Sequence, residues 1–332
     1  MAGNDNLHQS RSGKTDEFYT PLSMIENELK HYKQHFKGKT VFCNADDPAF
    51  SEDGVDHFGD GLGGYTSNFW CYFQLNFEEL GLKKLIATHY DPEKPTYKLE
   101  LSGDRNEDGV ISNLDVVKTP LRTNGDFRSP ECIEALKEAD IIVTNPPFSL
   151  FREYIVQLME YGKDFLVIGN MNAVTYKEIL PLVVQNKIWL GYNSGHFWFR
   201  VPDYYEEKKT DFKIDEDGQK WRRMGNICWF TNLDIAKRHE EMILFRKYNE
   251  NDYPKYDNYN AIHIKKTDEI PMDYFDVMAV PITFMAQYNP DQFEILGDSR
   301  FHDGQDFSDD INILNGKTTY RRLLIRRKQH EN

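Results

Sequence analysis

The strongest constraint on the fold is an alternation of short apolar runs and amphipathic segments between about residues 39 and 190. The apolar runs have the length and composition of buried strands and lie at 39–43, 83–89, 140–143 and 164–168. Segments with a helical spacing of apolar side chains lie at 67–80, 132–139, 149–161 and 175–186. Strands that alternate with helices predict an α/β fold with a parallel, doubly wound sheet that binds ligands at the carboxyl ends of its strands.

Local signals add detail to this pattern. Residues 22–36 predict an amphipathic helix that follows Pro21, and residues 96–101 alternate like a strand of a hairpin. Ser129 and Pro130 form a helix start, because serine is a favoured N-cap and proline fits the first helical position.

The expected domain boundaries follow from where the alternation begins and ends. Residues 1–15 are polar, lack the apolar segment of a signal peptide, and predict a disordered leader. After residue 190, turns, aromatic residues and short strand-like stretches dominate. We therefore expect a core over 16–190, with a sheet completed by 225–245, and a mostly β C-terminal region over 191–332.

Composition excludes several classes of protein. The 332 residues, 39% of them hydrophobic, are enough to build a large core. No apolar run approaches the roughly 20 residues that span a bilayer, so no membrane partner is expected. The four cysteines show neither metal-ligand nor disulfide spacing, which favours reduced thiols in a cytoplasmic protein; they are Cys43, Cys71, Cys132 and Cys228.

The net charge of −14 opposes binding to a polyanion such as DNA. The charge is unevenly distributed, however, because acids crowd into 46–60 and 104–115 while basic residues cluster at 220–223, at 265–266 and near the C-terminus. Such a distribution can present one basic face, although each cluster can equally be a set of ordinary solvated charges. The candidate DNA contacts are Arg222, Arg223, Arg321, Arg322, Arg326 and Arg327.

The sharpest chemical signal is Asn145-Pro146-Pro147-Phe148, between a predicted strand and a predicted helix. A planar amino group is a poor nucleophile because its lone pair is delocalised. Two acceptors on its N–H groups localise that lone pair, and the Asn145 side-chain oxygen and the Pro146 carbonyl can supply them. The prolines stiffen the loop, and Phe148 offers a ring on which an extruded base can stack. The alternative is a plain strand-to-helix turn that contains two prolines.

Several stretches match a single family pattern in its order along the chain; they are residues 16–21, 25–29, 42–48, 80–88, 125–129, 144–154 and 225–232. In these stretches the chain resembles the N6-adenine DNA methyltransferases, and more closely the EcoRI-type adenine methylases. The resemblance implies a Rossmann-like S-adenosyl-L-methionine (AdoMet) methyltransferase core at 16–190 and target recognition in 191–332. It further implies transfer of a methyl group to N6 of a flipped adenine in double-stranded DNA. The implied enzyme acts as a monomer, in restriction-modification or in protection of phage or host DNA.

The resemblance assigns further residues to the cofactor. Tyr19, Thr20 and Pro21 are similar to an N-terminal segment that contacts AdoMet. Asp126 and Phe127 resemble a pair that holds the cofactor adenine, the aspartate by a hydrogen bond and the phenylalanine by stacking.

The ends of the first two predicted strands supply weaker cofactor candidates. Asn44 and Asp47 follow the first strand, and Asp91 follows the second. The resemblance implies that Asp91 binds the ribose hydroxyls, with His89 and Tyr90 as alternative assignments. The first strand departs from the usual methyltransferase pattern, which places a glycine-rich turn there. The glycines come later in this chain, in an acidic insertion at 49–66 that can equally be a flexible loop; they are Gly59, Gly61, Gly63 and Gly64.

Two further groups have competing interpretations. Trp198 and Phe230 are candidates for a second wall of the base pocket, or else they belong to an aromatic core. The segment 104–115 has the spacing of a calcium loop, but it ends in aspartate and is equally a polar surface turn. Its candidate ligands are Asp104, Asn106, Asp108 and Asp115. No histidine cluster has metal-ligand spacing, so no catalytic metal is expected.

Two rival functions stay open at this point. The same loop suits other planar amino groups, namely cytosine N4, adenine in RNA or a glutamine side chain in a protein. The acidic charge and the insertion would also suit a DNA- or protein-binding module that is not an enzyme.

Overall fold

The computed structural model describes residues 18–45, 67–91, 95–202, 204–302, 305–306 and 312–329, and the chain divides into two compact units. The first unit comprises the described residues of Met1–Asn170 together with Asn193–Leu233, and the second comprises Met171–Tyr192 and those from Asp234 onward. The predicted leader at 1–15, Asp47 and the glycines of the insertion at 49–66 lie outside the described residues.

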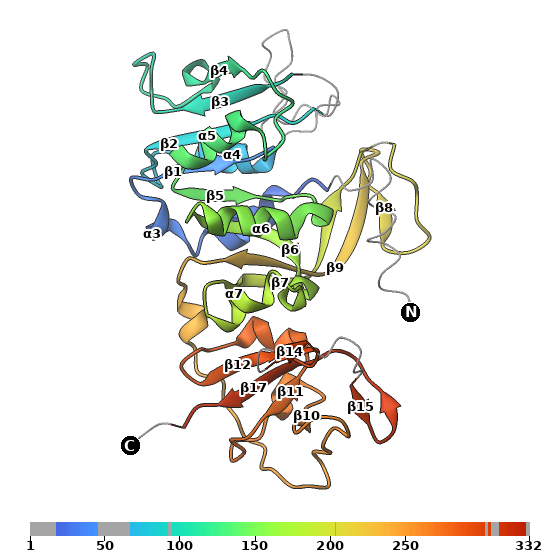
Figure 1. The fold of residues 1–332 in the computed structure, drawn as a ribbon. Helices are drawn as coiled ribbons and strands as arrows, with labels where there is room; N and C mark the ends of the chain where they lie inside the picture. The colour runs from blue at the N-terminus through green and yellow to red at the C-terminus, as the bar shows by residue number, and fades with distance from the viewer. Residues whose placement is uncertain are drawn as a thin grey trace. The chain divides into compact units, whose positions relative to one another are not determined.

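The first unit is built on a nine-stranded sheet with the order β4-β3-β2-β1-β5-β6-β9-β7, in which β8 also pairs with β9 (Figure 1). Its four central strands run parallel; they are β1 (Thr40–Cys43), β2 (Lys84–Thr88), β5 (Ile141–Thr144) and β6 (Asp164–Asn170). These strands are almost entirely buried, as expected for parallel strands covered on both faces.

The sheet is mixed, so the prediction of a parallel sheet holds only for its centre. The remaining strands are β3 (Tyr97–Leu101), β4 (Val117–Pro120), β7 (Trp189–Arg200), β8 (Phe212–Ile214) and β9 (Lys220–Thr231). β3 is antiparallel to β2 because residues 89–96 are too few for the crossover that a parallel neighbour needs. β9 is antiparallel to β6 at the other side of the centre.

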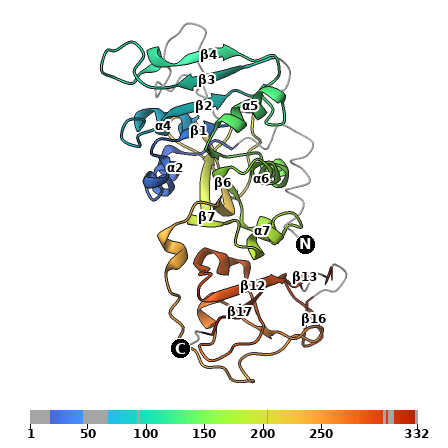
Figure 2. The ribbon, with the colours of Figure 1, turned by 60° about the vertical axis from the view of Figure 1, so that its left-hand side comes forward.

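Helices cover both faces of this sheet; they are α2 (Leu22–Leu29), α3 (Lys33–Phe36), α4 (Asn68–Leu75), α5 (Pro130–Glu138) and α6 (Phe151–Glu160). Figure 2 shows α2 and α4 on one side of the sheet and α5 and α6 on the other. The Ser129 side chain accepts a hydrogen bond from the Cys132 N–H, and Pro130 is the first helical residue, so the predicted helix start is confirmed. The helix predicted over 22–36 is instead two helices separated by a turn. Tyr32, between the two helices, and Phe36, at the end of the second, are both fully buried.

The second unit contains a six-stranded sheet with the order β10-β11-β17-β12-β13-β14. The strands are β10 (Ile262–His263), β11 (Met278–Val280), β12 (Phe293–Asp298), β13 (Phe301–His302), β14 (Gln305–Asp306) and β17 (Leu323–Arg327). A separate hairpin pairs β15 (Ile313–Leu314) with β16 (Lys317–Thr318) through Asn315 and Gly316, which both have positive φ. The helix predicted over 175–186 is reduced to α7 (Leu180–Val184).

Short 3-10 turns complete the two units; they are Asn113–Asp115, Phe148–Leu150, Met171–Thr175, Ala236–His239, Thr267–Glu269 and Ile282–Gln287. Among the described residues, no helix has the length and apolar character needed to cross a membrane.

The segment 104–115 folds as a polar turn that is held by its own backbone. The fully buried Asp115 carboxylate accepts hydrogen bonds from the N–H groups of Arg105, Asn106 and Ser112. Asp104 accepts from the N–H groups of Asp108 and Gly109. No group of three or more His, Cys, Asp or Glu side chains in the described part of the chain is arranged to hold a metal ion. The hydrogen bonds within the segment are those of a polar turn, and the calcium interpretation stays an alternative prediction.

We expect Asp115→Ala to lower the midpoint of thermal unfolding by several degrees, because three main-chain N–H groups lose their buried acceptor. Asp108→Ala is the matched control, since Asp108 serves an exposed N–H group and the change should have a small effect. Scanning calorimetry with added calcium or with a chelator should give the same midpoint. A midpoint that calcium raises in the wild type and not in these variants would contradict this account.

Candidate active site

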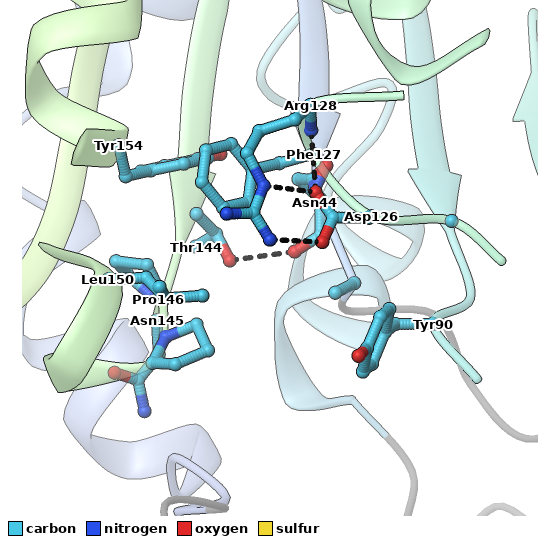
Figure 3. Close-up of a pocket in the computed structure, with 13 residues that line it drawn as sticks. Asn44, Tyr90, Asp126, Phe127, Arg128, Thr144, Asn145, Pro146, Leu150 and Tyr154 are labelled. Carbon is cyan, nitrogen blue, oxygen red and sulfur yellow. Dashed lines mark hydrogen bonds and ion pairs between the residues drawn. The ribbon is translucent and has the colours of Figure 1, made fainter. Parts of the chain in front are cut away.

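A pocket lies at the carboxyl ends of β1 and β5, where the two strands pair in parallel (Figure 3). Its volume is about 610 Å³ when the part open to solvent is counted. Its walls come from three parts of the first unit: the end of β1 with Tyr90 after β2, the 125–128 segment, and the loop from β5 into α6. Its lining includes the polar side chains of Asn44, Asp126, Arg128 and Asn145.

The loop after β5 is tied to its neighbours by specific hydrogen bonds. The Thr144 hydroxyl donates to the Asn44 carbonyl across 3.0 Å and joins the ends of β5 and β1. The Asn145 side-chain amide donates to the Phe18 carbonyl at 2.8 Å and to the Thr20 hydroxyl at 3.2 Å. These two hydrogen bonds therefore restrain the Asn145 amide group.

The rest of the Asn145 loop combines burial with partial exposure. Pro146 is buried, Pro147 is exposed, and Phe148 is half-buried. The Phe148 ring lies 5.7 Å from the Phe18 ring, with an angle of 31° between the planes. This partly exposed aromatic ring beside Asn145 is the kind of surface on which a planar ligand can stack.

Asp126 and Arg128 form a close ion pair at the pocket wall, visible in Figure 3. Asp126 Oδ1 accepts from the main-chain N–H and the Nε of Arg128, both at 2.8 Å, and Oδ2 accepts from its NH2 group at 2.6 Å. The Arg128 guanidinium lowers the pKa of Asp126 and keeps this carboxylate ionised.

Phe127 is mostly enclosed, with 8% of its surface exposed. The Tyr154 ring meets it edge-on at 5.1 Å, and the Arg128 guanidinium lies 5.0 Å from its ring centre. Phe127 lines the pocket together with Asp126, so these two residues, which were predicted as a pair, do lie together at the site.

Gly125 allows the backbone to approach β2 closely enough to place this pair. Its φ is +78°, and a Cβ there would lie 1.9 Å from the His89 carbonyl oxygen. No other residue type fits such a position without a shift of the backbone.

Asn44 presents a buried acceptor to the pocket. Only 6% of the residue is exposed, and its Oδ1 atom has no hydrogen-bond partner within the described residues. A buried acceptor without a donor is costly, so the atom suits a ligand that carries a hydroxyl or an ammonium group.

The other predicted cofactor residues among those described do not line this pocket. Tyr90 lines it, whereas Asp91 does not; the main-chain N–H of Asp91 donates to the Asn124 carbonyl. Tyr19 forms a β-bridge with Arg200, and neither it nor Thr20 and Pro21 lines the pocket.

The two aromatic candidates differ in exposure. Trp198 is half-buried, and the Lys213 ammonium lies 4.9 Å from its ring centre. Phe230 is fully buried and packs against Phe151 at 4.9 Å. The aromatic-core interpretation describes Phe230, since the ring has no surface to offer to a base.

The arginine candidates are engaged to different extents. In the first unit, the Arg222 side chain donates to the carbonyls of Thr210 and Asp211, and Arg223 pairs with the Asp211 carboxylate at 3.6 Å. In the second unit, Arg321 pairs at 2.6 Å with the fully buried Asp298, so it has a structural role.

The remaining candidate DNA-contacting arginines lie on β17 or directly before it in the chain. Arg326 is exposed and 3.7 Å from Glu294, while Arg327 donates to the Met272 carbonyl and lies over the Phe275 ring. Arg322 is half-buried.

Three residues of the site were not predicted from the sequence: Phe18, which binds Asn145, and Arg128 and Tyr154, which line the pocket. Phe18 and Arg128 lie inside the stretches that carry the family resemblance, so their neighbours Tyr19 and Phe127 were the available signal. Tyr154 lies in the resemblance stretch 144–154, and it is buried on α6 at the edge of the pocket.

Comparison with known proteins gives one consistent result. Residues 6–328 match the family described as adenine-specific methyltransferase EcoRI. The type II methyltransferase M.EcoRI of Escherichia coli is 44% identical, with 99% of this chain and 98% of that protein covered. M.MpnI of Mycoplasma pneumoniae is 36% identical, with 98% of each chain covered. M.MgeORF184P of Mycoplasma genitalium is also 36% identical, with 97% of this chain and 99% of that protein covered.

We expect Gly125→Ala to destabilise the protein by roughly 1–3 kcal/mol and to weaken ligand binding in the pocket, because the added Cβ forces Asp126 and Phe127 out of place. Gly162→Ala is the matched control: Gly162 also has a positive φ, of +61°, but nothing lies within 4 Å of its Cβ position. Chemical denaturation of both variants separates the clash from the backbone strain. Equal losses in the two variants would show that the close approach to His89 is unimportant.

Arg128→Met should raise the pKa of Asp126 towards its ordinary value, since the neighbouring cation is lost. A carboxylate with a lowered pKa stabilises the folded state above its unfolded pKa, and this stability disappears as the pH falls through the folded pKa. The difference in unfolding free energy between wild type and variant should therefore shrink between neutral pH and about pH 3. A carboxyl ¹³C NMR titration measures the pKa directly, and an unchanged Asp126 titration would refute the proposed cause.

Proposed function

The chain belongs to the EcoRI family of adenine-specific methyltransferases, and from this premise we propose that it transfers the methyl group of AdoMet to N6 of an adenine in double-stranded DNA. We further propose that the adenine is flipped out of the duplex and enters the pocket beside Asn145. The core is then a Rossmann-like methyltransferase domain, and the second unit carries target recognition.

The observation that carries this proposal is the restrained Asn145 amide at the carboxyl end of β5. Its NH2 group donates to Phe18 and Thr20, which directs Oδ1 as the acceptor for a further ligand. Asn145 Oδ1 and the Pro146 carbonyl would accept the two N–H groups of adenine N6 and localise its lone pair. The half-buried Phe148 ring would stack on the flipped base.

The residues of the pocket fit AdoMet. The unpartnered Asn44 Oδ1 suits a hydroxyl or ammonium donor of the cofactor. A carboxylate has about four acceptor positions, and Arg128 uses three of those on Asp126, so Oδ2 can accept one further N–H, as from an adenine amino group. AdoMet, when bound, supplies an electrophilic methyl group on a sulfonium.

The residues contribute mainly by positioning. Asn44 and Asp126 would hold AdoMet, which would supply the methyl group and leave as S-adenosylhomocysteine. N6, held by Asn145 and Pro146, would receive the methyl group and lose a proton. While N6 becomes tetrahedral and positively charged, Asn145 Oδ1 and the Pro146 carbonyl can strengthen their hydrogen bonds to it. Among the described residues no general base lies beside Asn145 in the pocket, and the proton can leave to water because N6 is strongly acidic once alkylated.

Double-stranded DNA as the partner requires a basic surface on a chain of net charge −14. The half-buried Arg322 and the exposed Arg326, which follow the β15–β16 hairpin in the chain, are the strongest candidates. Tyr320, which is 87% exposed, follows this hairpin and can contact bases or sugars. A place in a type II restriction-modification system follows from the same family premise.

Incubation with methyl-labelled AdoMet and either DNA, RNA or protein tests the proposal. We expect label in duplex DNA, recovered as N6-methyladenine after hydrolysis to nucleosides. Label in cytosine N4, in RNA or in glutamine would contradict the choice of acceptor, and no label in any of them would contradict the enzyme assignment.

Asn145→Ala should reduce the methylation rate by about 100-fold or more, since one of the two acceptors for N6 is lost. Asn251→Ala, an exposed asparagine of the second unit, is the control and should keep the wild-type rate. A near wild-type rate in Asn145→Ala would refute the acceptor role.

A further inference from the structure

Residues 18–21 are held firmly although they precede α2. The N–H and carbonyl of Tyr19 exchange hydrogen bonds with Arg200 on β7 at 2.9 and 3.1 Å. The Asn68 side chain, at the start of α4, donates to the Thr20 carbonyl at 2.7 Å. Pro21 restricts the backbone of Thr20 to extended conformations. Thr20 is 5% exposed, so its hydroxyl is fixed in a buried position.

The side chain of Phe18 adds a further restraint. Its ring lies 5.9 Å from Phe199 and 6.2 Å from Tyr205, in edge-to-face arrangements with both. The Phe18 carbonyl is thereby held at one side of the Asn145 amide, while the Thr20 hydroxyl is held near it from the same segment.

An asparagine side chain can present either its oxygen or its NH2 group in nearly the same shape. Only the oxygen can accept the N–H groups of a target amine; the NH2 group would instead repel them. Two acceptors on the NH2 side favour one orientation over the other by roughly two hydrogen bonds. The pair formed by Phe18 O and Thr20 Oγ1 therefore determines which end of the Asn145 amide meets a target.

We propose that Thr20 is a positioning residue, which sets the orientation of the Asn145 amide through its hydroxyl. This inference rests on the acceptor role of Asn145 in the proposed function. It differs from the role that the family resemblance implies for Thr20. The observation behind the inference is that the Thr20 hydroxyl contacts the Asn145 amide at 3.2 Å, while Asn145 itself lines the pocket.

Thr20→Val and Thr20→Ser separate the two roles, because valine keeps the shape of threonine while serine keeps the hydroxyl. We expect Thr20→Val to lower kcat by about tenfold, which corresponds to about 1.4 kcal/mol. The AdoMet Kd from isothermal titration and the KM for DNA should stay within about twofold of wild type. Thr20→Ser should restore most of kcat. Thr119→Val, on the exposed strand β4, controls for the substitution itself.

A weaker AdoMet Kd in Thr20→Val with an unchanged kcat would overturn the proposal in favour of direct cofactor contact. An unchanged kcat and Kd would overturn it as well, and so would a Thr20→Ser variant as impaired as Thr20→Val.

A measurement without turnover keeps this test independent of the methylation reaction. In ¹H–¹⁵N NMR spectra, the Asn145 side-chain NH2 signals are assigned by their loss in Asn145→Asp. They should exchange slowly with water in the wild type and in Thr20→Ser, and about tenfold or more faster in Thr20→Val. Equal exchange in all three proteins would refute the orienting contact even if the wild type proves inactive on DNA. Slow exchange together with an absence of methylation would instead refute the proposed function alone.

Discussion

β1 and β5 pair in parallel. Asn44, which directly follows β1, and Thr144, the last residue of β5, are hydrogen-bonded although they are 100 positions apart in the chain. From β1 the sheet continues to β2 on one side, and from β5 it continues to β6 on the other. The connections that leave the two carboxyl ends therefore diverge to opposite sides, which opens a crevice between them. The pocket with Asn44 and Asn145 lies at this point, so its position is a consequence of strand order.

Around this crevice, several groups are positioned by a group from a distant part of the sequence. Asn145 is bound by residues 18–20, Thr144 by the end of β1, and Gly125 permits the 125–128 segment to lie against β2. Such cross-connections reduce the motion of the groups that must be aligned for a displacement reaction, where alignment contributes most of the rate. The site is therefore preorganised by tertiary contacts, which no single loop could supply.

The sequence was sufficient for those parts that depend on local signals. The central strands, the Ser129 helix start and the placement of Asn145 after a buried strand follow from periodicity and capping, and the structure agrees with them. The hairpin strand predicted over 96–101 is β3, which is antiparallel to β2, and the segment 225–245 that was expected to complete the sheet contains the paired end of β9. That β9 pairs with β6 was not predicted, because pairing partners leave no local trace. Asp91 was predicted to line the site, but Tyr90 lines the pocket instead, and Phe230 lies in the core. Both outcomes depend on the direction in which a side chain points at the end of a strand or within it, which the sequence does not determine.

The chemistry of the Asn145 loop also limits what that loop can discriminate. Two acceptors recognise any planar amino group with two N–H donors, so the choice of adenine over cytosine must come from contacts with the rest of the base and with neighbouring nucleotides. Within the first unit, the Phe148 and Phe18 rings lie near enough to the amide to meet a base, but aromatic faces stack on purines and pyrimidines alike. Sequence preference therefore requires polar side chains outside this loop. A compact second unit with an arginine-bearing strand is consistent with a separation between the groups that activate the amine and those that choose it.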